Sequence, residues 1–286
     1  MHLAIPSAIS HFYHIQRALT TANRKTAYLS TAFHQDIVHW QLLCNRMKLR
    51  PTYLAEIVQR LPTDLGFADA LGLGGGDVWL DPNGNGTHFV WSFQRSADIQ
   101  ADLVSFDNPK GGITNSDLEL AALVLHEGTF PKVCKTAAWQ APLTGSDNTP
   151  TVAWTFKEAS TVNPVVANLL CIRSISNTKS SITPAVFYHP RLLNTMADDA
   201  SRLFYLPNPA FLPLFSNNYH PEQSPSSWTS CHPPNAAISS LISALRRQQS
   251  GEVTFPTLVP PTSTSNGPPS TPTSRSTNGF QTLTLQ

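Results

Sequence analysis

The fold of this chain is decided by the stretch Leu65-Gly66-Phe67-Ala68-Asp69-Ala70-Leu71, followed by Gly72-Leu73-Gly74-Gly75-Gly76. The first seven residues have the pattern of a strand that runs into a glycine-rich turn. Strands contain few aspartates, so a carboxylate inside this one needs a reason. It lies either at a strand end with no further role or in a functional site. Asp69 is therefore the first candidate functional residue.

Strand and helix patterns follow this stretch in a definite order. The further strands are expected at Val78–Leu80, Thr87–Gln94, Ile99–Phe106, Ala137–Leu143 and Ile182–Tyr188. The helices are expected at Asp117–Glu127, at 149–160, from Asn163-Pro164 onwards and at Leu193–Leu203. Consecutive strands followed by alternating helices and strands predict a mixed α/β fold, in which a meander is extended by parallel strands.

The chain divides into four regions by composition and pattern. Residues 1–60 have apolar residues at helical spacing, and Pro51 should end the second helical run because its ring disfavours a helical residue before it. Residues 61–206 form the α/β domain, and residues 207–250 are a linker with one short amphipathic helix. Residues 251–286 are mostly Pro, Ser, Thr, Asn and Gly, and we expect a disordered tail because they bury too little apolar surface.

Composition excludes several classes of protein. Hydrophobic residues make up 41% of the chain, which is enough for a core, and charged residues only 13%. No apolar run approaches the ~20 residues of a membrane span, so we expect no integral membrane protein. The four cysteines are far apart and have no zinc-like spacing, which argues against a disulfide scaffold and against a zinc module. We expect an intracellular protein, and the sequence does not distinguish cytoplasm from nucleus.

Charge is unevenly distributed although the net charge is +1. Residues 1–60 contain seven Lys or Arg and two acidic residues. Residues 61–210 contain nine Lys or Arg and fourteen acidic residues. A basic segment joined to an acidic one indicates a polyanion bound by the first part and a metal or catalytic site in the second. The alternative is two solvated surfaces of opposite charge.

Three more acidic positions are candidates for the same site. Glu119 begins a helix that is apolar on nearly all sides, although Ser116 and Glu119 also match a capping box. Asp147 follows a strand and could instead cap the next helix. Asp198 and Asp199 are adjacent on a late helix, so only one of them can face a given site.

Together these carboxylates favour a hard metal ion. They belong to a strand, a helix start, a strand end and a late helix, which a sheet can bring to one place. Mg²⁺ prefers oxygen ligands and often bridges to phosphate oxygens. Two such ions can activate a water molecule and stabilise the leaving oxygen in phosphodiester cleavage. Mg²⁺, or alternatively Mn²⁺, is therefore the expected cofactor.

Four motifs occur in a definite order along the chain: Phe67-Ala68-Asp69-Ala70, Glu119-Leu120-Ala121-Ala122, Ser146-Asp147-Asn148, and His189, Asn194 and Ala197-Asp198-Asp199-Ala200-Ser201-Arg202. In these motifs and their order the chain resembles a known family, the ribonuclease H domains attached to the reverse transcriptases of retroelements. The resemblance covers about residues 61–206. The helical segment before them is similar to the thumb and connection region of such polyproteins.

This resemblance implies a ribonuclease H-like, five-stranded mixed sheet with helices on both faces. It implies hydrolysis of the RNA strand of an RNA–DNA hybrid, with Asp69, Glu119, Asp147 and Asp198 as metal ligands. His189 lies where many members have a histidine that assists proton transfer or product release; otherwise it is a loop histidine before a proline.

The sequence departs from the family in two ways. The first motif usually reads Thr-Asp-Ala-Ser, and here hydroxyls are absent from Ala68 and Leu71. No Tyr/Phe-x-Asp-Asp polymerase motif occurs, so the chain resembles the back half of a polyprotein. A catalytically degenerate nucleic-acid-binding module from a truncated retroelement copy is therefore a second hypothesis. A globular protein with chance motif matches is a third.

The expected partner is a nucleic acid, with no role for a membrane. Phosphates attract Lys and Arg, and these contacts position a duplex without reading its bases. We expect Arg46, Lys48 and Arg50 to contact the backbone of an RNA–DNA hybrid. The sequence predicts no oligomeric state.

Overall fold

A computed structural model describes residues 9–10, 12–21, 29–49, 61–134, 140–159, 163–219 and 227–246. Its centre is a six-stranded sheet in the order β5-β4-β1-β2-β3-β6. The strands are β1 (Asp64–Ala70), β2 (Gly74–Leu80), β3 (Thr87–Gln94), β4 (Pro142–Ser146), β5 (Ala185–Tyr188) and β6 (Ser227–Ser230). The first three strands form an antiparallel meander, and the others add in parallel. The predicted mixed α/β class is confirmed.

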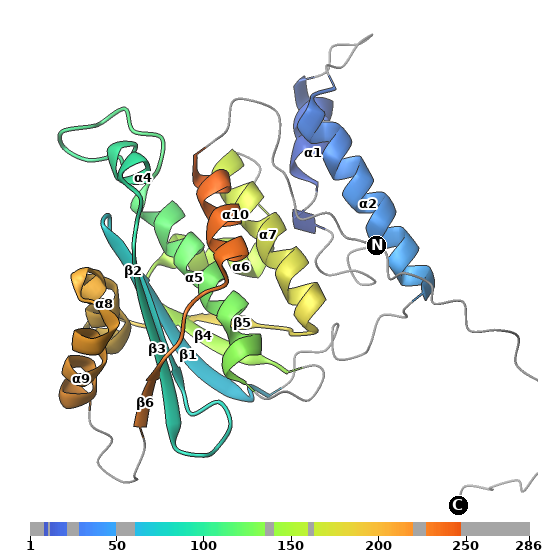
Figure 1. The fold of residues 1–286 in the computed structure, drawn as a ribbon. Coiled ribbons are helices and arrows are strands. Elements are labelled where there is room, and N and C mark those ends of the chain that lie inside the picture. The colour runs from blue at the N-terminus through green and yellow to red at the C-terminus, as the bar shows by residue number, and fades with distance from the viewer. Residues whose placement is uncertain are drawn as a thin grey trace, which may run out of the picture. The chain divides into compact units, whose positions relative to one another are not determined.

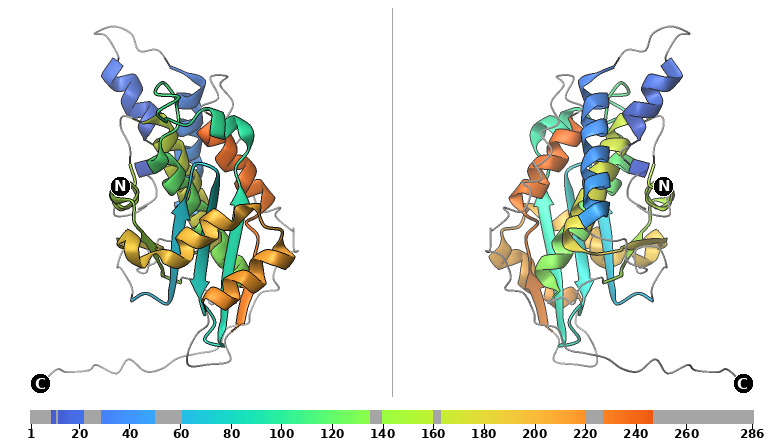
Figure 2. Two further views of the ribbon diagram at one scale, coloured as in Figure 1. Left: turned by 90° about the vertical axis from the view of Figure 1, so that its left-hand side faces the viewer. Right: turned by 90° about the vertical axis from the view of Figure 1, so that its right-hand side faces the viewer.

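Helices cover both faces of this sheet (Figure 1). One face is covered by α5 (Asn115–Val133), α6 (Thr149–Lys157), α7 (Pro164–Ser180) and α10 (Asn235–Leu245). The other is covered by α8 (Thr195–Arg202) and α9 (Asn208–Asn218), which lie in front of the sheet in the left view of Figure 2. Short 3-10 turns flank α8 at Arg191–Leu193 and Leu203–Tyr205.

A separate apolar cluster fills each side of the sheet. On the α5 side, Trp91 packs with Leu120 and Leu169, and α10 adds Leu241. Because α5 lies between the sheet and two other helices, its apolar residues are buried on every side, as its sequence predicts. On the α8 side the buried residues are Phe67, Val78, Val90, Ala197, Ala200, Phe211, Phe215 and Trp228.

Helix α8 lies unusually close to β2, and glycine makes this possible. A Cβ at Gly76 would lie 2.5 Å from the backbone carbon of Ala200 and 2.5 Å from the nitrogen of Ser201. A Cβ at Gly74 would lie 2.6 Å from the Ser201 carbonyl oxygen. The sequence predicted a strand only from Val78 and a turn before it, but the glycines belong to β2 itself. They are strand residues without side chains because a helix backbone occupies that space.

A buried ion pair with an added amide connects α5 and α7. The Arg173 guanidinium donates to both carboxylate oxygens of Glu127, with Nη2 2.8 Å from Oε1 and Nε 2.8 Å from Oε2. Asn177 donates to the same carboxylate at 2.8 Å. Both charges are therefore paired, as burial requires.

Three further expectations about the fold differ from the structure. Residues 99–106 do not form a strand but the short helix α4 (Ala97–Ala101) and a loop. The position beside β3 is occupied by β6, so no neighbouring strand is available to residues 99–106. Within the described residues the sheet has six strands, whereas the resemblance implied five. Residues 207–250, expected as a linker with one helix, contain α9 and β6 as well as α10.

The first region contains α1 (Tyr13–Thr21) and α2 (Thr31–Leu49), which pack together. Helix α2 is described up to Leu49, and Pro51, predicted to end this helical run, lies outside the described residues. Arg50, residues 51–60 and the tail at 251–286 lie outside the described residues, as do the side chains of Arg46 and Lys48. All four cysteines are free thiols. Within the described parts of the chain, no helix is both long and apolar enough to span a membrane.

The close contact between α8 and β2 leads to a test. Gly76→Ala should destabilise the protein by about 1–3 kcal/mol, because the new methyl group would overlap the backbone of α8. Gly128→Ala is the control, since its nearest neighbour is 3.9 Å away and alanine favours a helix by up to about 1 kcal/mol. Thermal unfolding measures both. Equal melting temperatures for wild type and Gly76→Ala would contradict this contact.

Candidate functional site

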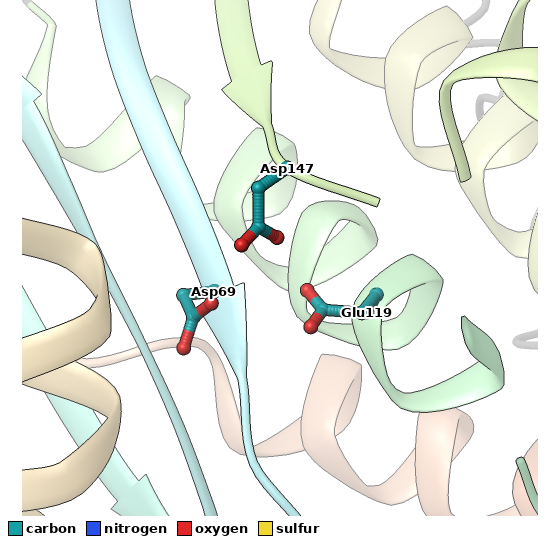
Figure 3. Close-up of side chains that lie close together, drawn as sticks. All are labelled: Asp69, Glu119 and Asp147. Atoms are coloured by element: carbon teal, nitrogen blue, oxygen red, sulfur yellow. The ribbon is translucent and has the colours of Figure 1, made fainter. Parts of the chain in front are cut away.

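Three carboxylates meet at one end of the sheet. Asp69, Glu119 and Asp147 each offer an oxygen atom, and these three atoms lie within 4.8 Å of one another. Figure 3 shows that they come from three different elements: the end of β1, the start of α5 and the end of β4. Asp69 and Glu119 are buried, and Asp147 is partly exposed. The structure thus brings together three of the four acids that the sequence predicted as metal ligands.

Glu119 is free to face this cluster because other residues cap its helix. The capping box consists of Thr114 and Asp117, and not of Ser116 and Glu119. The Thr114 hydroxyl accepts a bond from the Asp117 amide, and the Asp117 carboxylate accepts one from the Thr114 amide at 2.8 Å. With the helix end satisfied, Glu119 points inward and accepts only a long 3.4 Å hydrogen bond from Asn115.

Asp147 is likewise not needed as a helix cap. Asn148 caps α6 by accepting a hydrogen bond from the Thr151 amide at 3.0 Å. Its side-chain nitrogen also donates to the Ser116 hydroxyl at 3.2 Å, which ties the end of β4 to the first turn of α5. The alternative explanations for Glu119 and Asp147 therefore do not apply, and both carboxylates are available to a ligand.

The adjacent pair on α8 has two different environments. Asp198 forms a two-pronged ion pair with Arg202, with both N–O distances 2.7 Å. It is not one of the three residues of the cluster, but it is close enough for its charge to act on Asp69 and Asp147. Asp199 instead accepts a 2.7 Å hydrogen bond from the Tyr219 hydroxyl. The two residues thus point in different directions, as helix geometry requires.

Two residues of the last motif hold α8 against β1. The Ser201 hydroxyl donates a 2.6 Å hydrogen bond to Asp69, and Asn194 donates a 3.2 Å bond to the Ala68 carbonyl oxygen. The sequence contained both residues in its most specific motif but gave neither of them a role. Ser201 supplies to Asp69 a hydroxyl partner that positions 68 and 71 lack. The altered first motif therefore does not leave Asp69 without an orienting hydrogen bond.

The electrostatics of the site favour protonation when no cation is bound. Burial raises the pKa of Asp69 to about 6, against the Ser201 hydrogen bond, which lowers it. Burial, followed by the charges of Asp69 and Asp147, raises the pKa of Glu119 well above its usual range. Burial also raises the pKa of Asp147. Carboxylates that repel one another in a desolvated site are stabilised by a positive ion.

The donor set fits a hard divalent cation. All three groups offer carboxylate oxygens, which Mg²⁺ and Mn²⁺ accept, and the set contains no sulfur or imidazole donor. Partial exposure of Asp147 leaves one side of the cluster open. Asp69, Glu119 and Asp147 are thus the residues that could hold the metal.

His189 lies beside the cluster rather than in it. Its backbone amide donates to the Ser146 carbonyl oxygen at 2.9 Å, next to Asp147. Its ring packs on Phe67 with a centroid distance of 4.7 Å. The charges of Arg191 and then of His189 oppose the effect of burial on the pKa of Asp147. His189 is therefore near enough to Asp147 to act on a group bound there.

Comparison with known proteins gives matches only among solved structures. No protein-family model matches the chain, and no curated protein sequence does. RNase H1 of the halophilic archaeon Halobacterium salinarum NRC-1 is 14% identical, with a TM-score of 0.34, over 49% of this chain and 96% of its own. The N-terminal RNase H domain of a Mycobacterium tuberculosis protein is 16% identical, with a TM-score of 0.33, over 50% of this chain and 94% of its own. The fold assignment rests on the strand order and not on these values.

The buried carboxylates predict how stability depends on pH in EDTA. Folded Asp69 keeps its proton up to a pKa of about 6, whereas unfolded Asp69 loses it near its usual value of 3.8. The native state therefore loses stability as pH rises from about 4 to 6, by up to about 3 kcal/mol from this residue. Asp69→Asn removes this penalty and should be more stable than wild type at pH 7.5, with a smaller difference at pH 4.

Urea unfolding in EDTA at both pH values measures this effect. The control is Asp107→Asn, at an exposed loop position, which should change stability by less than about 0.5 kcal/mol. An Asp69→Asn protein that is less stable than wild type at pH 7.5 would show that the carboxylate is not penalised by burial.

Proposed function

We propose that this protein is a metal-dependent endonuclease that hydrolyses the RNA strand of RNA–DNA hybrids and derives from a retroelement polyprotein. The observation that carries the proposal is the meeting of Asp69, Glu119 and Asp147 from three elements, in the order of the family's motifs. The retroelement origin rests on the resemblance of the motifs, above all Ala197-Asp198 with Ser201-Arg202.

The residues of the site have distinct roles in this proposal. Asp69, Glu119 and Asp147 hold Mg²⁺ or Mn²⁺, and Ser201 orients Asp69. Bound divalent metal lowers the pKa of water and stabilises charge on a phosphodiester. Asp198, beside the cluster, would complete the ligand set on leaving Arg202, its partly exposed ion-pair partner. His189 assists proton transfer or product release next to Asp147.

Cleavage of a labelled RNA–DNA hybrid tests the proposal. We expect cleavage of the RNA strand with Mg²⁺ or Mn²⁺ and none in EDTA. Asp69→Asn keeps the volume but removes a ligand charge, so the rate should fall at least about 100-fold, because a metal supplies several kcal/mol to the transition state. Binding of the hybrid should persist, since one negative charge near the phosphates is lost.

The adjacent pair on α8 provides a matched control. Asp198→Asn should reduce cleavage, whereas Asp199→Asn should cleave like wild type, because Asp199 faces Tyr219. Equal cleavage in EDTA and Mg²⁺ would refute the metal-dependent reaction. Hybrid binding without cleavage under either metal would support the catalytically degenerate binding module instead.

The basic first region provides a separate prediction about binding. Each phosphate contact made by Arg46, Lys48 or Arg50 should contribute about 0.9 to the slope of log affinity against log salt concentration. Replacing all three with glutamine should weaken hybrid binding and reduce this slope, while cleavage at saturating hybrid is unchanged. Fluorescence anisotropy over a salt series measures it, and an unchanged slope would exclude these contacts.

A further inference from the structure

Arg95 is a buried arginine directly behind the carboxylate cluster. It follows β3 at the end of the sheet where Asp69 and Glu119 lie, and only 5% of its surface is exposed. Burial lowers the pKa of Arg95 to about 10, and the charges of Glu119 and then Asp69 oppose this effect. The guanidinium therefore remains positively charged at neutral pH. A buried charge of this kind requires specific partners.

The partners of Arg95 belong to the two segments that carry Asp69 and Glu119. Its Nε donates to the carbonyl oxygen of Leu71 at 3.0 Å, directly after β1, and to that of Gly74 at 3.2 Å, at the start of β2. Its Nη2 donates at 3.5 Å to the carbonyl oxygen of Leu118, the residue before Glu119. One side chain thus connects the end of β1 to the first turn of α5.

The fold keeps a space for this side chain. Gly75 lies on the face of β2 opposite to α8, and a Cβ there would be 3.3 Å from Arg95 Nη2 and 2.8 Å from Phe93 Cε1. The Phe93 ring lies 5.4 Å below the guanidinium carbon, at the distance of a cation–π contact. The backbone amide of Arg95 also donates to the Leu73 carbonyl oxygen at 2.9 Å. The position of the guanidinium is therefore fixed from several sides.

We propose that Arg95 is a positioning residue of the metal site, which fixes the separation of Asp69 and Glu119 and places a permanent positive charge behind them. The inference rests on the proposed function, since it concerns the same carboxylates. The positive charge of Arg95 reduces the repulsion between Asp69 and Glu119 before a metal binds. The hydrogen bonds of its guanidinium fix the positions of the two segments that carry these acids. Arginine suits this role because it donates from two separate nitrogens, Nε and Nη2, of one planar group, whereas a lysine ammonium donates from a single nitrogen.

Mn²⁺ binding to the full chain, measured by electron paramagnetic resonance, tests this role without nucleic acid. Arg95→Lys keeps the charge but loses the fork, and we expect the affinity for Mn²⁺ to fall about 10-fold or more, as for other residues that orient metal ligands. The matched control is Arg173→Lys, a second buried arginine that bonds to Glu127 away from the cluster. It should lower the melting temperature but leave Mn²⁺ affinity within about two-fold of wild type.

A second variant covers the case in which Arg95→Lys does not fold. Gly75→Ala keeps the arginine, but the new methyl group would displace the Phe93 ring below the guanidinium and press on Nη2 itself, so it should weaken Mn²⁺ binding in the same direction. With hybrid as substrate, both variants should lower kcat and leave KM unchanged, because buried Arg95 does not reach the nucleic acid.

The outcomes separate this inference from the proposed function. Wild type that binds Mn²⁺ but cuts no hybrid overturns the nuclease, whereas the fall in affinity for Arg95→Lys would still support the positioning role. Unchanged affinity in Arg95→Lys and Gly75→Ala, or an equal loss in Arg173→Lys, overturns the role of Arg95. So does a wild-type protein that binds no Mn²⁺.

Discussion

Helix α8 rests directly on the backbone of β2, because Gly74 and Gly76 have no side chains to hold it away. Gly76 is the residue paired with Asp69 across the two strands, so the helix reaches β2 at the level of the candidate site. Only at this short distance can the Ser201 hydroxyl bond to Asp69 and Asn194 reach β1. A larger residue at position 76 would therefore affect the orientation of a carboxylate as well as the packing of a helix.

The site itself is costly for folding, and the surrounding structure offsets that cost. Three acids share a small desolvated volume, and burial raises the pKa of each of them. The elements that carry the acids are held by hydrogen bonds of their own: Thr114 and Asp117 cap α5, and Asn148 ties the end of β4 to Ser116. The carboxylate oxygens of the three acids therefore remain available to a cation. This combination is typical of sites that are preorganised for a cation.

Much of this arrangement follows from the sequence. The β-branched and aromatic residues predicted β3, the apolar run predicted α5, and the order of the elements predicted the mixed sheet. The motifs indicated four acids, of which three meet. Three features could not be predicted. Whether a glycine ends a strand or admits a helix depends on tertiary contacts, and β6 is four residues long in a segment rich in proline and serine. The role of Arg95 depends on carbonyl groups that no side-chain pattern reveals.

Strand β6 also has a consequence for the solution behaviour of shorter versions of this protein. It pairs in parallel with β3, and its Trp228 packs against Phe215 and Val90 in the cluster on the α8 side. A polypeptide cut after residue 206, where the family resemblance ends, would expose the edge of β3 at Thr87–Val90, where β6 pairs with it. Such an open edge is a template for edge-to-edge aggregation. Strand β6 therefore covers this edge of the sheet, and residues 227–246 belong with the domain whenever it is produced alone.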